Sequence, residues 1–118
     1  MDESRPIFVQ ITEQIENDII SGQMAEETQV PSTNEFAAFY RINPATALKG
    51  VSRLVDEGIL YKKRGIGMFV AEGAQAQLVT KRRDQFQSEF VRPLLQEAGK
   101  LGISSTQLAE MIREEGKK

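Results

Sequence analysis

The chain has 118 residues, of which 40% are apolar, and it contains neither cysteine nor histidine. This composition excludes disulfides, thiol nucleophiles and metal sites built on Cys ligands, and it removes the commonest general base. Fifteen Lys and Arg against 17 Asp and Glu give a formal net charge of −2, a balance that on its face argues against nucleic acid. The length suits one small domain with a short appendage.

The start of the chain, Met1–Arg5, is charged and is not followed by an apolar run of signal-peptide length. No stretch approaches the roughly 18 apolar residues that a membrane span requires. We therefore expect a cytoplasmic protein that does not contact a membrane.

The charges are unevenly distributed along the chain. Residues 1–30 hold one basic and seven acidic side chains, whereas residues 31–70 hold six basic and three acidic ones. The remaining 48 residues are nearly balanced, with eight basic and seven acidic side chains. The middle of the chain is therefore basic, although a mixed-charge solvated surface would give similar counts.

The first predicted helix covers residues 6–20. Isoleucines recur every four residues along it, and Glu13, Glu16 and Asp18 fall off that apolar stripe. Pro6 suits the start of a helix, and Ser21-Gly22 indicates its end. The polar residues 23–31 are predicted to form a loop.

Two short helices joined by a tight connection follow this loop. Ser32 and Glu35 have the spacing of a capping box at the start of the second helix, and Asn43-Pro44 opens the third as N-cap and first helical residue. Gly50 lies inside the third helix, where glycine costs about 1 kcal/mol, so we expect a crossing helix to approach closely there.

Residues 59–62 and 68–71 read as two strands, and the turn between them carries two glycines. They predict a β-hairpin. The order helix, helix, turn, helix, hairpin is that of a winged helix-turn-helix, in which the second helix of the pair enters the major groove by its N-terminal end.

Several side chains are candidates for DNA contacts. Lys49 can bind guanine edges or a phosphate, Thr46 can donate to a base, and Ala45 is small enough to meet a thymine methyl. Helix N-termini favour phosphate, and glycines let the backbone of the hairpin turn approach DNA. The predicted DNA-binding residues are Ser32, Thr33, Asn43, Ala45, Thr46, Lys49, Arg53, Lys62, Arg64, Gly65 and Gly67.

The composition changes from residue 73, after which a long helical pattern is interrupted at Pro93, where we expect a kink or break near Arg92. Ser104 and Gln107 form a second capping box. Too little chain remains to bury the apolar stripe of this tail, so a partner subunit is expected to cover it. The predicted dimerisation residues are Leu78, Phe86, Phe90, Leu94, Leu95, Leu108 and Ile112.

Residues 6–70 resemble the GntR family of bacterial transcription regulators. The resemblance rests on Pro6–Ile11, Val30–Ser32, Asp56–Gly58 and Arg64–Val70, and Ile42–Thr46 with the short tail is most similar to the YtrA subfamily. This resemblance implies a small helical dimerisation tail rather than a large metabolite-binding domain. The chain departs from the family at Asn34, Pro44 and Leu48, where arginine is common.

We therefore predict a mainly α fold with a small β-hairpin (α+β class): a winged helix-turn-helix at residues 1–72 and a helical dimerisation region at 73–118. The predicted function is a homodimeric regulator, a repressor, that binds double-stranded DNA at a pseudo-palindromic operator and has no cofactor, with room for a small-molecule effector. The alternative is a winged helix that binds another protein instead of DNA. A carboxylate-based hydrolase is a third, weaker reading, because no paired carboxylates fall on a predicted pocket.

Overall fold

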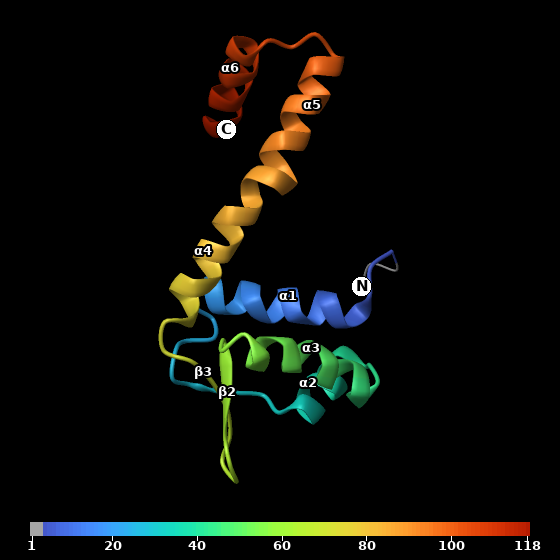
Figure 1. Cartoon of the computed structure of the whole chain (residues 1–118), viewed down its shortest axis with the longest axis vertical. Helices are drawn as coiled ribbons and strands as arrows, with labels where there is room; N and C mark the ends of the chain where they lie inside the picture. Colours follow the sequence, from blue (N-terminus) through green and yellow to red (C-terminus); the bar gives the residue numbers. More distant parts are fainter. Residues whose placement is uncertain (1–3) are drawn as a thin grey trace. The chain divides into compact units, whose positions relative to one another are not determined.

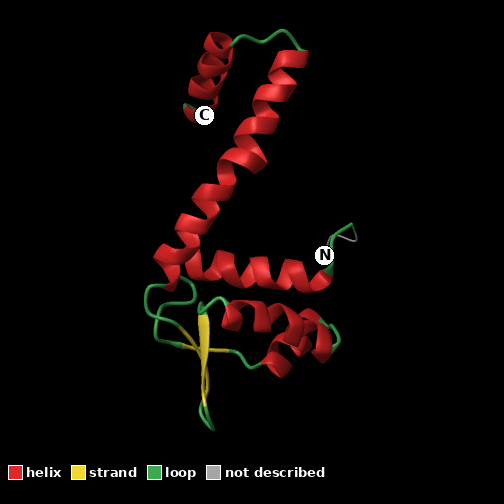
Figure 2. Cartoon of the chain, in the orientation of Figure 1, coloured by secondary structure: helices red, strands yellow, loops and turns green. Residues whose placement is uncertain are grey.

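The computed structural model describes residues 4–118, and the chain divides into two compact units. The first ends at Thr80 and the second comprises Lys81–Lys118. Three helices, a small sheet and the start of a fourth helix build the first unit (Figures 1 and 2). The predicted fold class, mainly α with a small antiparallel β element, is confirmed.

Helix α1 runs from Ile7 to Ile20 directly after Pro6, as predicted, and the isoleucines at 11, 15 and 19 are buried. Ile7, the first of the stripe, is exposed. The expectation that Glu16 lies off the buried face is wrong, since Glu16 is only 4% exposed. The buried face of α1 is wider than the isoleucine stripe because the neighbouring helix α3 also covers the side that carries Thr12, one turn before Glu16.

Helices α1 and α3 cross at Gly50, and α1 lies over α3 in Figure 1. A Cβ atom at position 50 would lie 2.8 Å from the carbonyl oxygen of Phe8. The hydroxyl of Thr12 donates to the carbonyl oxygen of Gly50 across the same contact at 2.8 Å. The predicted close approach is confirmed, and it explains a glycine in the middle of a helix.

Helices α2 (Thr33–Tyr40) and α3 (Pro44–Asp56) form the helix-turn-helix. Both predicted caps are present: the Ser32 hydroxyl accepts from the Glu35 N–H at 3.1 Å, and Asn43 is the N-cap of α3. Arg41 ends α2 with φ +55°, a left-handed conformation that turns the chain sharply into α3. The tight connection between the two helices is therefore built from one αL residue.

The sheet has three antiparallel strands in the order β1-β3-β2, shown in yellow in Figure 2. The predicted hairpin is formed by β2 (Leu60–Lys63) and β3 (Gly67–Val70). The prediction of a plain loop over residues 23–31 is wrong at its end, where β1 (Gln29–Val30) pairs with β3. Two residues are too short to show an alternating pattern, so only pairing with a distant strand defines β1.

The core of the first unit joins the isoleucines of α1 to apolar side chains of α2, α3 and the sheet. Ala74 and Leu78, from the first turns of α4 (Ala74–Phe86), complete this core and are at most 1% exposed. The carboxylate of Glu26 accepts from the backbone N–H groups of Gly73 and Gln75 at 2.7 and 3.1 Å. The start of α4 is therefore fastened to the winged helix by both packing and hydrogen bonds.

The second unit contains the end of α4, a π-helical turn η1 (Gln87–Val91), α5 (Arg92–Lys100) and α6 (Ser105–Gly116). The predicted interruption near Arg92 is confirmed: the Arg92 N–H bonds to the carbonyl of Gln87, five residues back. The missing N–H of Pro93 accounts for a change of helical geometry at this place. After Gly102, α6 turns back antiparallel to α5, and its predicted Ser104–Gln107 capping box is present. Within residues 4–118, no helix is long and apolar enough to cross a bilayer.

Candidate nucleic-acid interface

The N-terminal end of α3 presents small and polar groups. The Asn43 side-chain oxygen accepts from the Ala45 N–H at 2.8 Å, which leaves the amide NH₂ of Asn43 for other partners. Ala45 is exposed and Thr46 is half-buried. These three predicted contact residues lie together at the start of the helix, where the positive end of the helix dipole also favours a phosphate.

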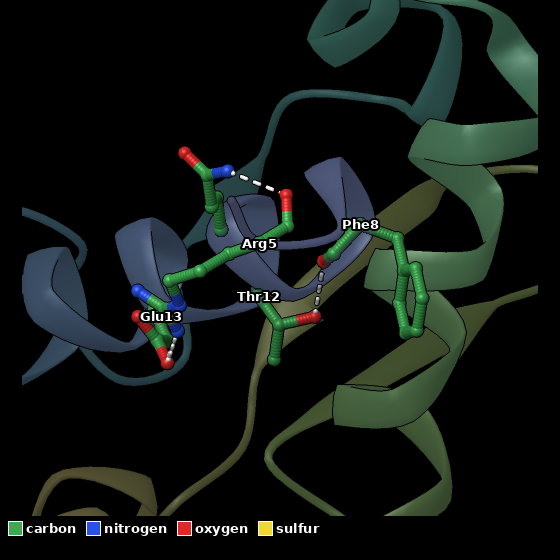
Figure 3. A network of polar contacts seen from close by, with 5 residues as sticks. Arg5, Phe8, Thr12 and Glu13 are labelled. Atoms are coloured by element: carbon green, nitrogen blue, oxygen red, sulfur yellow. Dashed lines mark hydrogen bonds and ion pairs between the residues drawn. The ribbon is translucent and has the colours of Figure 1, made fainter. Parts of the chain in front are cut away.

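The two cationic side chains of α3 lean on one aromatic ring of α1. The ammonium of Lys49 lies 4.1 Å from the centroid of the Phe8 ring, and the guanidinium of Arg53 lies 5.7 Å from it. In Figure 3 the Phe8 ring lies beside the green ribbon of α3. Cation–π attraction therefore holds both charges on the side of α3 that faces α1.

Phe8 is fixed by the backbone contacts around it. The Thr12 hydroxyl lies 3.0 Å from the Phe8 carbonyl oxygen (Figure 3) and 2.8 Å from the carbonyl oxygen of Gly50, so it bridges the two helices. Arg5, which precedes α1, pairs with Glu13 of that helix (Figure 3). The sequence analysis did not identify Phe8, because a single aromatic at a helix start does not show which cations a distant helix will bring to it.

The N-terminus of α2 and the tip of the hairpin border a common groove of about 540 Å³. The exposed carboxylate of Glu35 lies at its edge and accepts the Ser32 N–H at 3.0 Å. These hydrogen bonds from the backbone and the hydroxyl of Ser32 hold the pKa of Glu35 below its usual value. The groove brings together six of the predicted DNA-binding residues: Ser32, Thr33, Lys62, Arg64, Gly65 and Gly67.

Gln29 of β1 fixes the shape of the hairpin tip. Its side-chain amide donates to the carbonyl oxygen of Ile66 at 3.1 Å. Gly67 has φ +145°, and a Cβ there would collide with the Gln29 amide, while Gly65 has φ +76°. Both glycines are therefore required by the turn itself. The sequence analysis did not identify Gln29, because it placed β1 in a loop.

The basic triplet of the hairpin divides between the two faces of the sheet. The ammonium of Lys63 lies 4.5 Å from the centroid of Phe69, on the face where the Tyr61 and Phe69 rings stack. The Tyr61 hydroxyl donates to Glu27 at 2.8 Å, which raises the pKa of Tyr61. Lys62 pairs in register with buried Met68, so its side chain starts from the opposite face of the sheet. All three residues of the triplet border the groove.

The residues predicted for dimerisation have two different environments. Leu78 is fully buried in the core of the first unit, and Leu108 is buried in the second. The other five have exposed fractions of 44–62% in the second unit: Phe86, Phe90, Leu94, Leu95 and Ile112. Leu101 and Met111, which the sequence analysis did not single out, are exposed as well. Among residues 4–118 no group of three or more acidic side chains is arranged to hold a metal ion.

Three comparisons with known proteins agree with this geometry. The model of the bacterial regulatory proteins, gntR family, matches residues 8–70. The HTH-type transcriptional repressor YtrA of Bacillus subtilis is 32% identical over 111 residues, which cover 94% of this chain and 85% of YtrA. A putative GntR-family transcriptional regulator from Bacteroides thetaiotaomicron has 36% identity and a TM-score of 0.76, with 92% of this chain and 94% of that one covered. The AraR DNA-binding domain, in complex with operator ORX1, has 30% identity and a TM-score of 0.55, with 60% of this chain and 87% of that one covered.

Proposed function

Because the chain belongs to the GntR family of bacterial regulatory proteins, a family of transcription regulators, we propose that it is a repressor that binds a pseudo-palindromic operator as a homodimer. The resemblance seen in the sequence is thereby confirmed, and so is a DNA-binding regulator rather than an enzyme as the general class. The proposal goes beyond this general class in three respects: repression, the symmetry of the operator and the homodimer.

The observation that carries the proposal is the groove between the wing tip and the N-terminus of α2. It brings Lys62 and Arg64 of the wing together with the Ser32 cap of α2. A phosphate chain that follows the groove would meet cationic side chains on one wall and a helix N-terminus on the other. The first turn of α3, in the same unit, would then enter the major groove.

The exposed apolar side chains of the second unit support a dimer. Phe86 and Phe90 contact each other, with ring centroids 5.6 Å apart, but both remain largely exposed in a single copy. Contiguous exposed apolar surface is uncommon on a stable monomer. A second copy covering this surface would give a two-fold dimer, whose half-sites lie about one helical turn apart.

Selection of binding sites from random DNA tests the proposal. We expect enrichment of an inverted repeat and binding that weakens steeply with salt. The variant Lys62→Ala/Arg64→Ala should bind operator and random DNA more weakly, with a salt slope lower by about one for each lost phosphate contact. Lys100→Ala, at an exposed position of α5 in the second unit, is the matched control and should change binding little.

Failure to enrich any sequence would reject the operator-binding proposal. If DNA binding were the same in the wild type and in a Lys49→Ala/Arg64→Ala variant, the alternative of a winged helix that binds protein would be favoured. A small-molecule effector stays a prediction.

A further inference from the structure

The exposed side of α3, the helix expected to enter the major groove, carries an apolar residue at Leu48, where arginine is common in the family. Leu48 is 47% exposed, and Ala45, three residues earlier, is exposed too. Residues three apart lie on one side of a helix. Lys49, the cation next to them, is turned toward the Phe8 ring at 4.1 Å. The aliphatic side chain of Leu48 therefore projects from the exposed side of α3, where a ligand could contact it.

Helical geometry places these two residues away from the protein core. Gly50 marks the side of α3 that touches α1. At 3.6 residues per turn, Leu48 points about 160° away from Gly50 and Ala45 about 140° away. Neither residue belongs to the buried set of α3, which is Ala47, Gly50, Val51 and Leu54.

The groups around this apolar edge favour DNA as its partner over an apolar protein surface. Lys49 and Arg53 lie along the α1 side of the same helix, and Lys62 and Arg64 lie on the wing of the same unit. An aliphatic contact in a unit that carries cations on the same helix and on the wing suits a polyanion that displays apolar groups at defined places. The C5-methyl of thymine is the apolar group that the major groove displays.

We propose that Leu48, with Ala45 beside it, contacts thymine methyl groups and makes this protein select A·T pairs at those positions of its operator. A leucine side chain has no donor or acceptor for any base edge. It gains an apolar contact at an A·T pair, where the thymine methyl lies, whereas a G·C pair would offer it polar groups alone and leave them unpaired. The inference rests on the proposed DNA-binding function and concerns how the same surface chooses its sequence.

Uracil substitution in the selected operator tests the inference, because uracil keeps the base pairing of thymine and lacks its methyl group. Replacing the contacted thymine by uracil should weaken wild-type binding about fourfold in one half-site and about 15-fold in both, from the burial of one methyl each. In Leu48→Ala the same replacement should have little effect, since the partner of the methyl has gone.

Val79→Ala is the matched control: it also shortens an exposed aliphatic side chain, but on α4. It should keep the wild-type response to uracil, and thermal melting should show that both variants are folded. If Leu48→Ala binds the operator as tightly as the wild type, or responds to uracil as the wild type does, the inference is wrong and the apolar edge is left for a protein partner. If no operator is found at all, the proposed function fails instead.

Discussion

The two units of the chain use apolar residues in opposite ways. In the first, aliphatic side chains from α1, α3, the sheet and α4 pack into one cluster in which nine large side chains are less than 2% exposed. In the second, the buried apolar residues within the described chain are Ala98 and Leu108, while seven large ones are exposed. The first unit therefore buries most of its large apolar side chains by itself, whereas the second leaves most of its large apolar side chains for a partner.

Matched leucine substitutions in the two units should give the largest difference, measured as the change in the free energy of unfolding. Leu54→Ala removes a completely buried side chain of the first unit and should lower the free energy of unfolding by about 2–5 kcal/mol. Leu95→Ala changes the same atoms at a half-exposed position of the second unit and should leave the unfolding of the first unit unchanged. Denaturant titration followed by circular dichroism measures both, and equal losses would contradict the comparison.

The exposed aromatic pair should control self-association. Phe90→Ser is expected to weaken the dimer by about 2 kcal/mol, because buried aromatics are typical hot spots of interfaces. Sedimentation velocity over a range of concentrations measures the effect. Glu115→Gln, at an exposed position of α6, serves as the control. A wild-type protein that is monomeric at micromolar concentration would remove the dimer from the account.

Two helical glycines provide the next test. Gly50→Ala forces a Cβ toward the Phe8 carbonyl oxygen and should destabilise the first unit by about 1–3 kcal/mol. Gly99→Ala in α5 meets no atom within 4 Å and should stabilise its helix by about 1 kcal/mol. Opposite shifts in melting temperature would support the difference in packing, and shifts of the same sign would not.

The position of Lys49 predicts a loss of affinity without a loss of specificity. With its ammonium over Phe8, Lys49→Gln should weaken binding to operator and random DNA alike and lower the salt slope by about one. Gel-shift titrations at several salt concentrations measure this. A loss confined to the operator, about 1–3 kcal/mol, would instead assign Lys49 to a base.

The smallest expected effect is a difference in pH dependence between the two capping boxes: the box of α2 should contribute less to stability in acid, and the box of α6 should not change. Glu35 has a lowered pKa, so its contribution to stability is present above the ordinary value of about 4.3 and is lost as the pH falls through the folded-state value. Glu35→Gln should therefore melt below the wild type at neutral pH and approach it in acid. The box of α6 uses Gln107, which does not titrate, so Gln107→Ala should lower stability equally at both pH values.

Local rules predicted the helices well and the sites only in part. The caps at Ser32, Asn43 and Ser104 lie within three residues of the groups they bond, so the sequence is enough to identify them. Three other features depend on contacts between residues about 40 apart along the chain. They are the pairing of β1 with β3, the hydrogen bond of the Gln29 amide to the wing tip, and the contact of Lys49 with the Phe8 ring. The burial of Glu16 has the same origin, since neighbouring elements, not α1 alone, decide how wide the buried face becomes.

The number of protein copies on a selected operator decides whether the first unit reads DNA while the second pairs two copies. We predict two protein copies on an inverted repeat, measured as the mass of the complex by sedimentation equilibrium, with much weaker binding to a single half-site. One copy bound with full affinity to a half-site would show that the second unit does not pair two copies on DNA.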